Sequence, residues 1–359
     1  MQYSTFAAID IGSYDVILEI FEISKKQGIR SVDKICHRME LGKDTYTLGK
    51  IRPEMEEELC RVLADFVRIM EGYRVDDYRA TASSAISEAS NSLYVLGKIH
   101  QLTGLSVTVL SNSEQRFLSY KALAAMEDNF NKIIEKGTAI LDLDGGSFQI
   151  SLFDKDALVT TQNIRMGSLR IRERLAGIQS ETEHYEEMVE ELIWNEVSSF
   201  KKMYLKDRKI ENIMLIGDVF TDSVYQNIEE KTTKIISREN FNTWYEKIIR
   251  QSPMELAVKL GIPLENASLM YPSAVIYKCL IDMMGAEHIW IPGVHMTRGI
   301  AYEYAEQMKL LKGGHNFEND ILMAAKNIGK RYAVNRPHVQ NLEMTALAMF
   351  DATKKMHGM

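Results

Sequence analysis

The sequence predicts an α/β protein of two domains followed by a helical tail. Its 359 residues exceed the size of one ordinary hydrophobic core, and a hydrophobic content of 45% is enough to fill two cores. Stretches typical of strands alternate with stretches of helical periodicity, which favours an α/β class over an all-α class. A strand–turn–strand pattern near the N-terminus also returns in the second half. We therefore expect domains at residues 1–130 and 131–310 and a helical tail at residues 315–359.

The first domain is expected to alternate strands with helices. Residues 3–41 are rich in β-branched and aromatic residues, whereas residues 53–73 place apolar side chains at helical spacing. In chain order, the expected elements are strands at 3–11, 16–23 and 29–41, a helix at 53–73, a strand at 78–82, a helix at 86–101, a strand at 106–110 and a helix that begins near Asn112.

The second domain is expected to open in the same way and then to become mostly helical. Its expected elements are strands at 138–142, 148–153, 213–216 and 288–291, and helices at 181–203, 273–284 and 297–309. The tail at 319–357 is expected to be helical throughout. Its amphipathic pattern continues almost to Met359, which favours a longer parent protein with a further helical domain.

Composition excludes several classes of function. The chain has 43 basic and 50 acidic residues, a formal net charge of -7, so we expect no specific nucleic-acid site. The three cysteines are widely spaced and form no CxxC pair, which excludes a disulfide framework and indicates a cytoplasmic protein. We expect no membrane span, because no apolar stretch approaches the roughly 20 residues that a bilayer requires.

The repeated pattern carries the functional argument. Residues 8–13 (AIDIGS) and 140–147 (ILDLDGGS) each read as a buried strand that ends in an aspartate, a glycine/serine turn and a returning strand. Backbone N–H groups and hydroxyls of such turns suit phosphate oxygens, and an aspartate at the strand end can hold a divalent cation. Asp10 and Asp142 are therefore metal candidates. The candidates for binding phosphate are Gly12, Ser13, Gly145, Gly146 and Ser147.

The alternative interpretation is two ordinary hairpins whose aspartates cap turns. A single occurrence of the pattern would favour that alternative. Its return in the same structural context favours a functional duplication, with the two aspartates facing each other across a cleft between the domains.

Several separated motifs add a resemblance to a known family. They are residues 10–13 (DIGS), 81–91 (TASSAISEASN), 109–115 (VLSNSEQ), 142–147 (DLDGGS), 166–170 (MGSLR) and 296–299 (MTRG). In order and spacing they resemble the exopolyphosphatase/guanosine pentaphosphate phosphatase (Ppx/GppA) family. This resemblance implies two ribonuclease-H-like domains of the actin/sugar-kinase superfamily, Mg²⁺ as cofactor, and hydrolysis of polyphosphate or guanosine pentaphosphate. The tail resembles the start of the family's C-terminal helical domain.

The chain departs from the family pattern where the chemistry is expected. Gln115 stands at the position of the family's catalytic glutamate, and Glu114 survives beside it. Asp144 places a carboxylate inside the second phosphate turn, and Ser87 replaces a phosphate-binding arginine. A glutamine side chain cannot accept a proton from water. The catalytic candidates are therefore Gln115 by position, Glu114 and Asp142.

Three functions compete. The first is a Ppx/GppA-like phosphohydrolase with a weakened active site. The alternative is a non-catalytic regulatory protein that binds a guanosine nucleotide or polyphosphate in the same cleft. A kinase of the same superfamily fits less well, because the motifs follow the phosphatase branch. The true substrate, its chain length and a homodimeric state stay open at this level.

Overall fold

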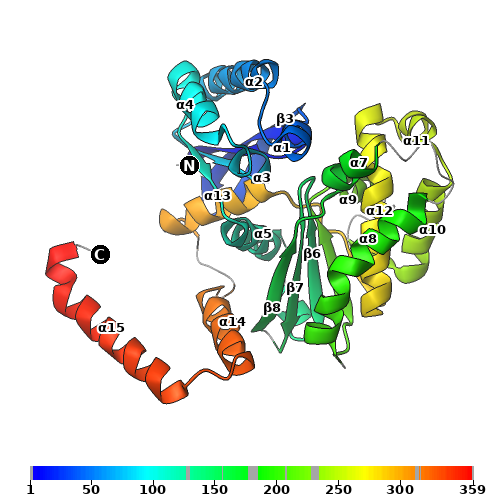
Figure 1. The fold of residues 1–359 in the computed structure, drawn as a ribbon. Coiled ribbons are helices and arrows are strands. Elements are labelled where there is room, and N and C mark those ends of the chain that lie inside the picture. Colours follow the sequence, from blue (N-terminus) through cyan, green and yellow to red (C-terminus); the bar gives the residue numbers. More distant parts are fainter. Residues whose placement is uncertain are drawn as a thin grey trace.

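The structure is a computed structural model in which two mixed sheets lie side by side, each with its own helices, and a helical tail leaves the body (Figure 1). The residues that it describes are 3–126, 130–155, 157–176, 185–206, 208–227, 234–311, 315 and 317–357.

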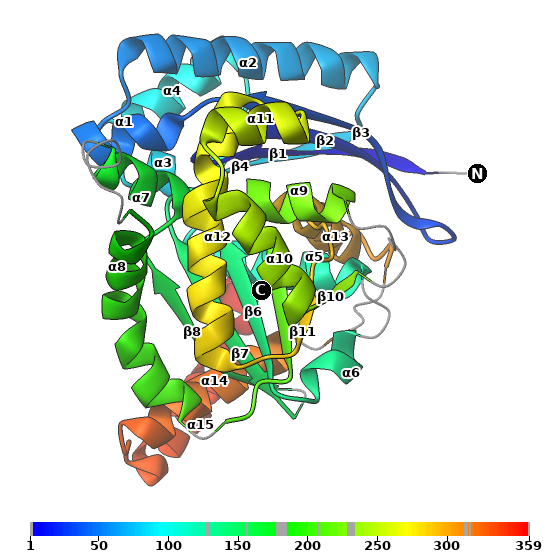
Figure 2. The same ribbon diagram turned by 90° about the vertical axis from the view of Figure 1, so that its right-hand side faces the viewer.

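The first sheet has the strand order β3-β2-β1-β4-β5. Its strands are β1 (Ser4–Ile11), β2 (Asp15–Ser24), β3 (Gly28–Arg38), β4 (Asp77–Ala82) and β5 (Val107–Val109). β1 pairs with β2 in antiparallel and with β4 in parallel orientation. Two helices, α2 (Pro53–Gly72) and α4 (Ser92–Thr103), lie over one face of this sheet (Figure 2). Two short helices, α1 (Leu41–Leu48) and α3 (Ser84–Ser87), lie beside the turn that follows β1.

The second sheet repeats this topology with one additional edge strand. Its order is β10-β11-β9-β6-β7-β8. The strands are β6 (Thr138–Leu143), β7 (Phe148–Asp154), β8 (Ala157–Ile164), β9 (Asn212–Ile216), β10 (Ile235–Ser237) and β11 (His288–Trp290). β6 is antiparallel to β7 and parallel to β9, as β1 is to β2 and β4. The two halves of the chain are therefore structural duplicates.

The largest hydrophobic core lies between the second sheet and its helices. Those helices are α7 (Ser168–Leu175), α8 (Tyr185–Phe200) with a π-helical turn at Lys201–Leu205, α9 (Val219–Asn227), α10 (Arg238–Ile249), α11 (Pro253–Leu260) and α12 (Leu264–Met284). α12 is apolar around most of its surface and contributes most of its side chains to this core, which is typical of a buried helix. It begins nine residues before the expected 273 and contains Pro272.

One helix after the second sheet returns to the first. α13 (Met296–Gln307) lies inside the range expected for the second domain, yet Ile300 and Ala301 pack with Phe6 and Phe21 of the first sheet. Tyr304 stacks on Phe6 with ring centroids 4.1 Å apart. α13 therefore packs on the first sheet although it follows the strands of the second in the chain.

The helix α5 (Asn112–Met126) touches both sheets. Leu118 packs with the α13 side of the first sheet, whereas Tyr120 and Leu123 pack with strands of the second and with α6 (Phe130–Ile134). Ala122 lies at the same junction. α5 is thus the shared wall on which the two halves meet.

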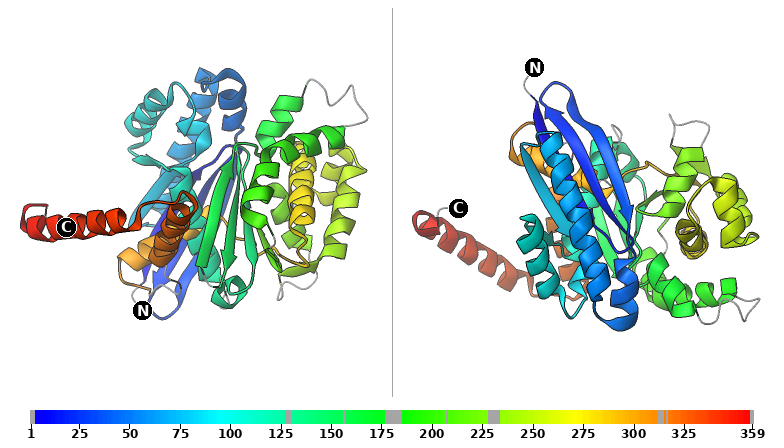
Figure 3. Two further views of the ribbon diagram at one scale, coloured as in Figure 1. Left: turned by 60° about the horizontal axis from the view of Figure 1, so that its bottom comes forward. Right: turned by 90° about the horizontal axis from the view of Figure 1, so that it is seen from above.

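The tail is helical, as expected, and consists of two helices. α14 (Phe317–Arg331) packs along β8, and α15 (Arg336–His357) projects away from the body (Figure 3). Ala333 between them adopts a left-handed conformation with φ of 49°, which ends α14. The helical nature of this region is confirmed.

The expected elements differ from the structure in a few other places. The helix expected at 86–101 is two helices, α3 and α4, and the strands β8 and β10 were not anticipated. The start of the helix expected at 181–203 lies outside the described residues. Within the described part of the chain, no helix combines the length and the apolar character that crossing a membrane requires.

Candidate active site

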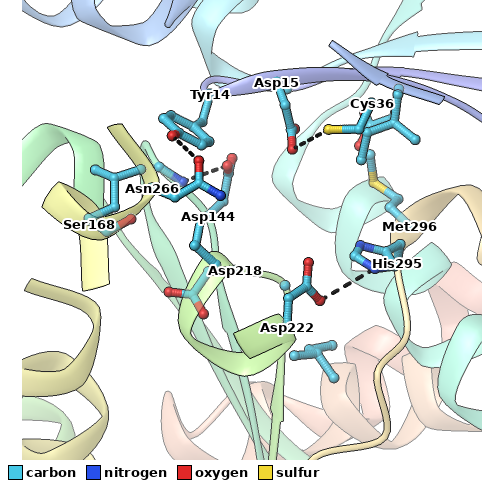
Figure 4. A pocket seen from close by; sticks show the side chains of 18 of the residues that line it. Tyr14, Asp15, Cys36, Asp144, Ser168, Asp218, Asp222, Asn266, His295 and Met296 are labelled. Carbon is cyan, nitrogen blue, oxygen red and sulfur yellow. Dashed lines mark hydrogen bonds and ion pairs between the residues drawn. The ribbon is translucent and has the colours of Figure 1, made fainter. Parts of the chain in front are cut away.

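The two repeated hairpin turns meet at one cavity. Gly12 N donates to Asp15 O at 2.9 Å in the first turn, and Asp144 N donates to Ser147 O at 2.9 Å in the second. Asp10 pairs across the strands with Ile17, and Asp142 pairs with Gln149 at the equivalent position. A cavity of about 380 Å³ opens between the turns (Figure 4). Both aspartates line it, as the duplication predicts.

Asp10 lies at the end of β1, and its side chain lines the cavity. Burial raises its pKa well above the usual range, and the nearby carboxylates of Asp15, Asp144 and Asp142 raise it further. Its Oδ1 atom is buried without a hydrogen-bond partner among the described residues. A buried polar atom of this kind is costly unless a ligand, water or ion completes it.

Asp142 is held by the shared wall α5. Ser119 Oγ donates to Asp142 Oδ2 at 2.6 Å. Gln115 lies four residues earlier and therefore on the same face of α5, and its Nε2 is buried without a described partner. Burial raises the pKa of Asp142 to about 6, and the Ser119 hydrogen bond partly offsets this rise.

Asp144 changes the second turn into a self-capped loop. Its Oδ1 accepts the N–H of Gly145 at 2.6 Å, so this amide is no longer free for a phosphate oxygen. Its Oδ2 lies 3.5 Å from Ser13 Oγ, which donates to it. Burial raises the pKa of Asp144 to about 6. The carboxylate thus occupies hydrogen-bonding capacity that an anionic substrate would otherwise use.

The structure divides the predicted phosphate-binding residues into two groups. Gly12, Gly145 and Ser147 line the cavity, whereas Ser13 and Gly146 do not. Ser13 is fully buried and forms a 2.6 Å hydrogen bond with the hydroxyl of Tyr46 on α1. Gly146 lies against the same hydroxyl.

The two adjacent residues at the family's catalytic position point to different places. Gln115 lines the cavity, but Glu114 does not. The Glu114 carboxylate accepts the N–H of Ser111 at 2.7 Å, and Ser111 Oγ accepts the N–H of Glu114 at 3.3 Å. This arrangement is a helix capping box, readable in the sequence as Ser-x-x-Glu. Glu114 therefore has a structural role, and Ser87 is an exposed residue that does not line the cavity either.

Asp218 is a site residue that the sequence reasoning did not select. It follows β9, which lies parallel to β6, so its carboxyl group reaches the same edge as Asp142. Its Oδ1 accepts the N–H of Thr221 at 3.1 Å and the hydroxyl of Tyr277 at 3.3 Å, while Oδ2 is buried without a described partner. Burial raises its pKa to about 7. The sequence gives one indication of this role, because Asp218 closely follows a strand that lies parallel to β6.

Basic side chains also line the cavity, and side chains from the two halves of the molecule contact each other beside it. Lys34 and Arg38 of β3 line the cavity. Tyr14 Oη donates to Asn266 Oδ1 at 2.6 Å from across the cleft, as Figure 4 shows. Arg172 binds both carboxylate oxygens of Glu40 at 2.8 Å, which ties α7 to the strand-to-helix connection before α1. These contacts connect the two halves of the molecule beside the turns.

We expect Asp218→Asn to stabilise the protein at pH 8 and to have a much smaller effect at pH 4. A pKa raised from 3.8 to about 7 means that the folded state holds the proton more tightly. The stability that this provides is present below pH 4 and is lost as the pH rises to 7, by at most on the order of 4 kcal/mol. Urea unfolding at both pH values measures it. Asp65→Asn on the exposed face of α2 is the control, and an equal effect at both pH values would contradict the expectation.

The residues present fit a hard divalent cation such as Mg²⁺. Side chains with carboxylate, hydroxyl and amide oxygens line the same cavity as Asp10, whose Oδ1 has no described partner, and Mg²⁺ prefers oxygen ligands. Among the described residues, no three acidic, histidine or cysteine side chains converge as a complete metal site. Mg²⁺ usually keeps water and binds one or two carboxylates together with substrate phosphates, so a complete protein cage is not needed.

A comparison of the sequence with family models matches most of the chain to one family. The model described as the Ppx/GppA phosphatase family matches residues 19–308. The chain belongs to the Ppx/GppA phosphatase family. The resemblance inferred from the separated motifs is thus confirmed.

Curated proteins similar to this Ppx/GppA member are named as phosphatases. A bifunctional 3-dehydroquinate synthase/phosphatase of Fusobacterium nucleatum is 21% identical over 310 residues, which are 79% of this chain and 44% of the relative. Exopolyphosphatase 1 of Mycobacterium leprae is 25% identical over 144 residues, 40% of this chain and 41% of the relative. This chain therefore spans less than half the length of these two relatives in the matched regions.

Solved structures of the Ppx/GppA family share the fold. An exopolyphosphatase of Cytophaga hutchinsonii superposes with a TM-score of 0.75 at 17% identity, covering 85% of this chain and 98% of that one. The Aquifex aeolicus family member gives a TM-score of 0.69 at 17% identity, with 86% and 99% covered. The expected fold, two ribonuclease-H-like domains with a helical C-terminal region, is confirmed.

Proposed function

We propose that this Ppx/GppA family member is a slow phosphohydrolase that removes terminal phosphoryl groups from polyphosphate or guanosine pentaphosphate. The observation that carries the proposal is the convergence of Asp10, Asp142 and Gln115 on one cavity between two duplicated turns. The names of the relatives support a phosphatase reaction, and the exopolyphosphatases among them support a polyphosphate substrate.

Each wall of the cavity has a role in this proposal. Asp10, whose Oδ1 has no described partner, would hold Mg²⁺, which when bound neutralises phosphate charge. The turns at Gly12 and Ser147 position the terminal phosphate, and Lys34 and Arg38 attract the anionic chain. Catalysis of phosphoryl transfer consists mostly of such positioning and charge neutralisation. Water attacks the terminal phosphorus, and the shortened chain leaves with the electrons of the broken P–O bond.

The proton of the attacking water needs an acceptor other than Gln115. Asp142 is the carboxylate that Ser119 holds against the face of α5 that carries Gln115. Its pKa of about 6 leaves it ionised at neutral pH and still basic enough to take a proton. We therefore assign water activation to Asp142. A displaced base and the acidic second turn both lower the rate relative to members with the glutamate.

We expect Mg²⁺-dependent phosphate release whose kcat/KM rises as the pH increases through about 6, because Asp142 must be ionised to accept the proton. The measurement is steady-state phosphate release from polyphosphate and from guanosine pentaphosphate over a pH series. Asp144→Asn is the matched control, since Asp144 has a similar pKa but does not contact Ser119.

The rise of kcat/KM through about pH 6 should persist in Asp144→Asn. In Asp142→Asn it should vanish together with most of the rate. No release of phosphate from either substrate, with binding of one of them retained, would instead favour a non-catalytic binding protein.

A further inference from the structure

Tyr46 fills the space directly behind the two turns. Its hydroxyl forms hydrogen bonds with Ser13 Oγ at 2.6 Å and with Ser84 Oγ at 2.8 Å. Ser84 belongs to the segment after β4, and its neighbour Ser83 lines the cavity. Three hydroxyl groups thus meet where the first and second turns approach each other, with Asp144 at the edge of the group.

Two glycines make room for this side chain. A Cβ atom on Gly146 would lie 2.1 Å from Tyr46 Oη and 2.4 Å from Ser84 Oγ. A Cβ atom on Gly42, one helical turn before Tyr46, would lie 2.6 Å from its ring. Real Cβ atoms do not approach other atoms so closely, so the tyrosine and the second turn are packed against each other without a gap.

An arginine from the other half of the molecule covers the ring. The Arg170 guanidinium lies 3.8 Å from the centre of the Tyr46 ring, a cation–π contact. Arg170 Nε donates to Gly146 O at 2.8 Å, and its NH2 group donates to Glu88 at 3.0 Å. Burial raises the pKa of Tyr46 to about 12, so the phenol stays neutral and can share its hydrogen.

The consequence is a cavity that is closed at the end where the reacting groups lie. Asp10, Asp142 and Asp144 stand on the cavity side of the turns, and Tyr46 stands on the other side. Tyr46 is partly exposed, so beyond it lies solvent. A phosphate chain that enters from the open side meets this barrier as soon as its first phosphate reaches the aspartates.

We infer that Tyr46 is the residue that makes the cleft blind, so that a phosphate chain is admitted only by a free terminal phosphate. This inference rests on the proposed function and deepens it, because it names the residue that restricts attack to chain ends. An internal phosphoanhydride bond reaches the aspartates only if the chain can continue past the turns. The tyrosine, fixed by Ser13, Ser84 and Arg170, prevents this.

The test compares free-ended long-chain polyphosphate with the same polymer blocked at both ends by a bulky amine-linked fluorophore. Both binding and Mg²⁺-dependent phosphate release are measured for wild type, Tyr46→Ala, Tyr46→Phe and Tyr73→Ala. Tyr73 follows α2 on the outer surface and serves as the matched control. We expect wild type and Tyr73→Ala to prefer the free-ended polymer by about tenfold or more, the scale at which a fitted site rejects a misfitting group.

In Tyr46→Ala, the ratio of binding of the free-ended polymer to binding of the blocked polymer should fall close to one. The blocked polymer should bind better, with little change for the free-ended one. Tyr46→Phe keeps the ring under Arg170 and should stay selective. If Tyr46→Ala does not fold, a loss of selectivity in Tyr46→Phe overturns the inference that the ring is the barrier. An unchanged preference in folded Tyr46→Ala, or no preference in wild type, overturns the inference. Absence of phosphate release with the binding preference intact overturns only the hydrolytic function.

Discussion

Replacing Gln115 with glutamate is expected to raise the rate of polyphosphate hydrolysis by about 10²–10⁴-fold, the usual contribution of a well-placed general base. Glutamate has the shape of glutamine, and the Nε2 atom that it replaces has no described partner to lose. The new carboxylate faces the same cavity as Asp142 and can take the proton of the attacking water. The gain should appear in kcat more than in KM, because the group acts in the chemical step.

The measurement is steady-state phosphate release with Mg²⁺ and polyphosphate. Glu114→Gln is the matched control, because Glu114 belongs to the capping box of α5 and lies outside the cavity. Its variant should show the wild-type rate. A Gln115→Glu variant that binds substrate and gains no rate would show that the acidic second turn, and not the displaced position of the base, limits catalysis.

Gly299→Ala, in the family motif at 296–299, should strongly destabilise the protein. Its Cβ would lie 2.0 Å from the carbonyl oxygen of Leu118, so α13 and α5 touch backbone to backbone at this point. A rigid backbone cannot yield as a side chain does, and we expect a loss of roughly 3 kcal/mol or more in the free energy of unfolding. The displaced α5 would also move Gln115 and Ser119, so activity should fall as well.

Urea unfolding measures this effect, with Gly97→Ala as the control. Gly97 lies inside α4, and nothing stands within 4 Å of a Cβ placed on it. That variant should be neutral or more stable by up to about 1 kcal/mol, because alanine favours a helix more than glycine does. Similar free energies of unfolding for the two variants would contradict the proposed close contact.

The fold was largely predictable because strand patterns and the repeated turn are local signals. The duplication at residues 8–13 and 140–147 anticipated the equivalent pairing of Asp10 and Asp142. The return of α13 to the first sheet was not predictable, because helical periodicity shows which face of a helix is apolar but not which sheet covers it. The break at Ala333 was missed because alanine is usually a helix former.

The sequence predicted correctly that the aspartates at the strand ends line the cavity. It was less successful in predicting which residues of the two turns line it. Whether a glycine faces a ligand or a neighbouring side chain depends on contacts between distant segments, and Gly146 faces Tyr46 from α1. The role of Glu114 could have been read from the Ser-x-x-Glu pattern at residues 111–114, which competes with any catalytic role. Tyr46 itself has no local signal, since a single tyrosine in a short helix is typical of ordinary packing.

The return of α13 has a practical consequence for dissecting the protein. A fragment that ends near residue 130 keeps all strands of the first sheet but loses the cover over Phe6, Phe21 and Ile23. Such a fragment would expose a large apolar surface, and exposed patches of this kind promote aggregation. An expressible form of the first half therefore requires residues 296–311 to be joined to it through a short linker. The second half is, in this sense, a long insertion between a sheet and the helix that completes it.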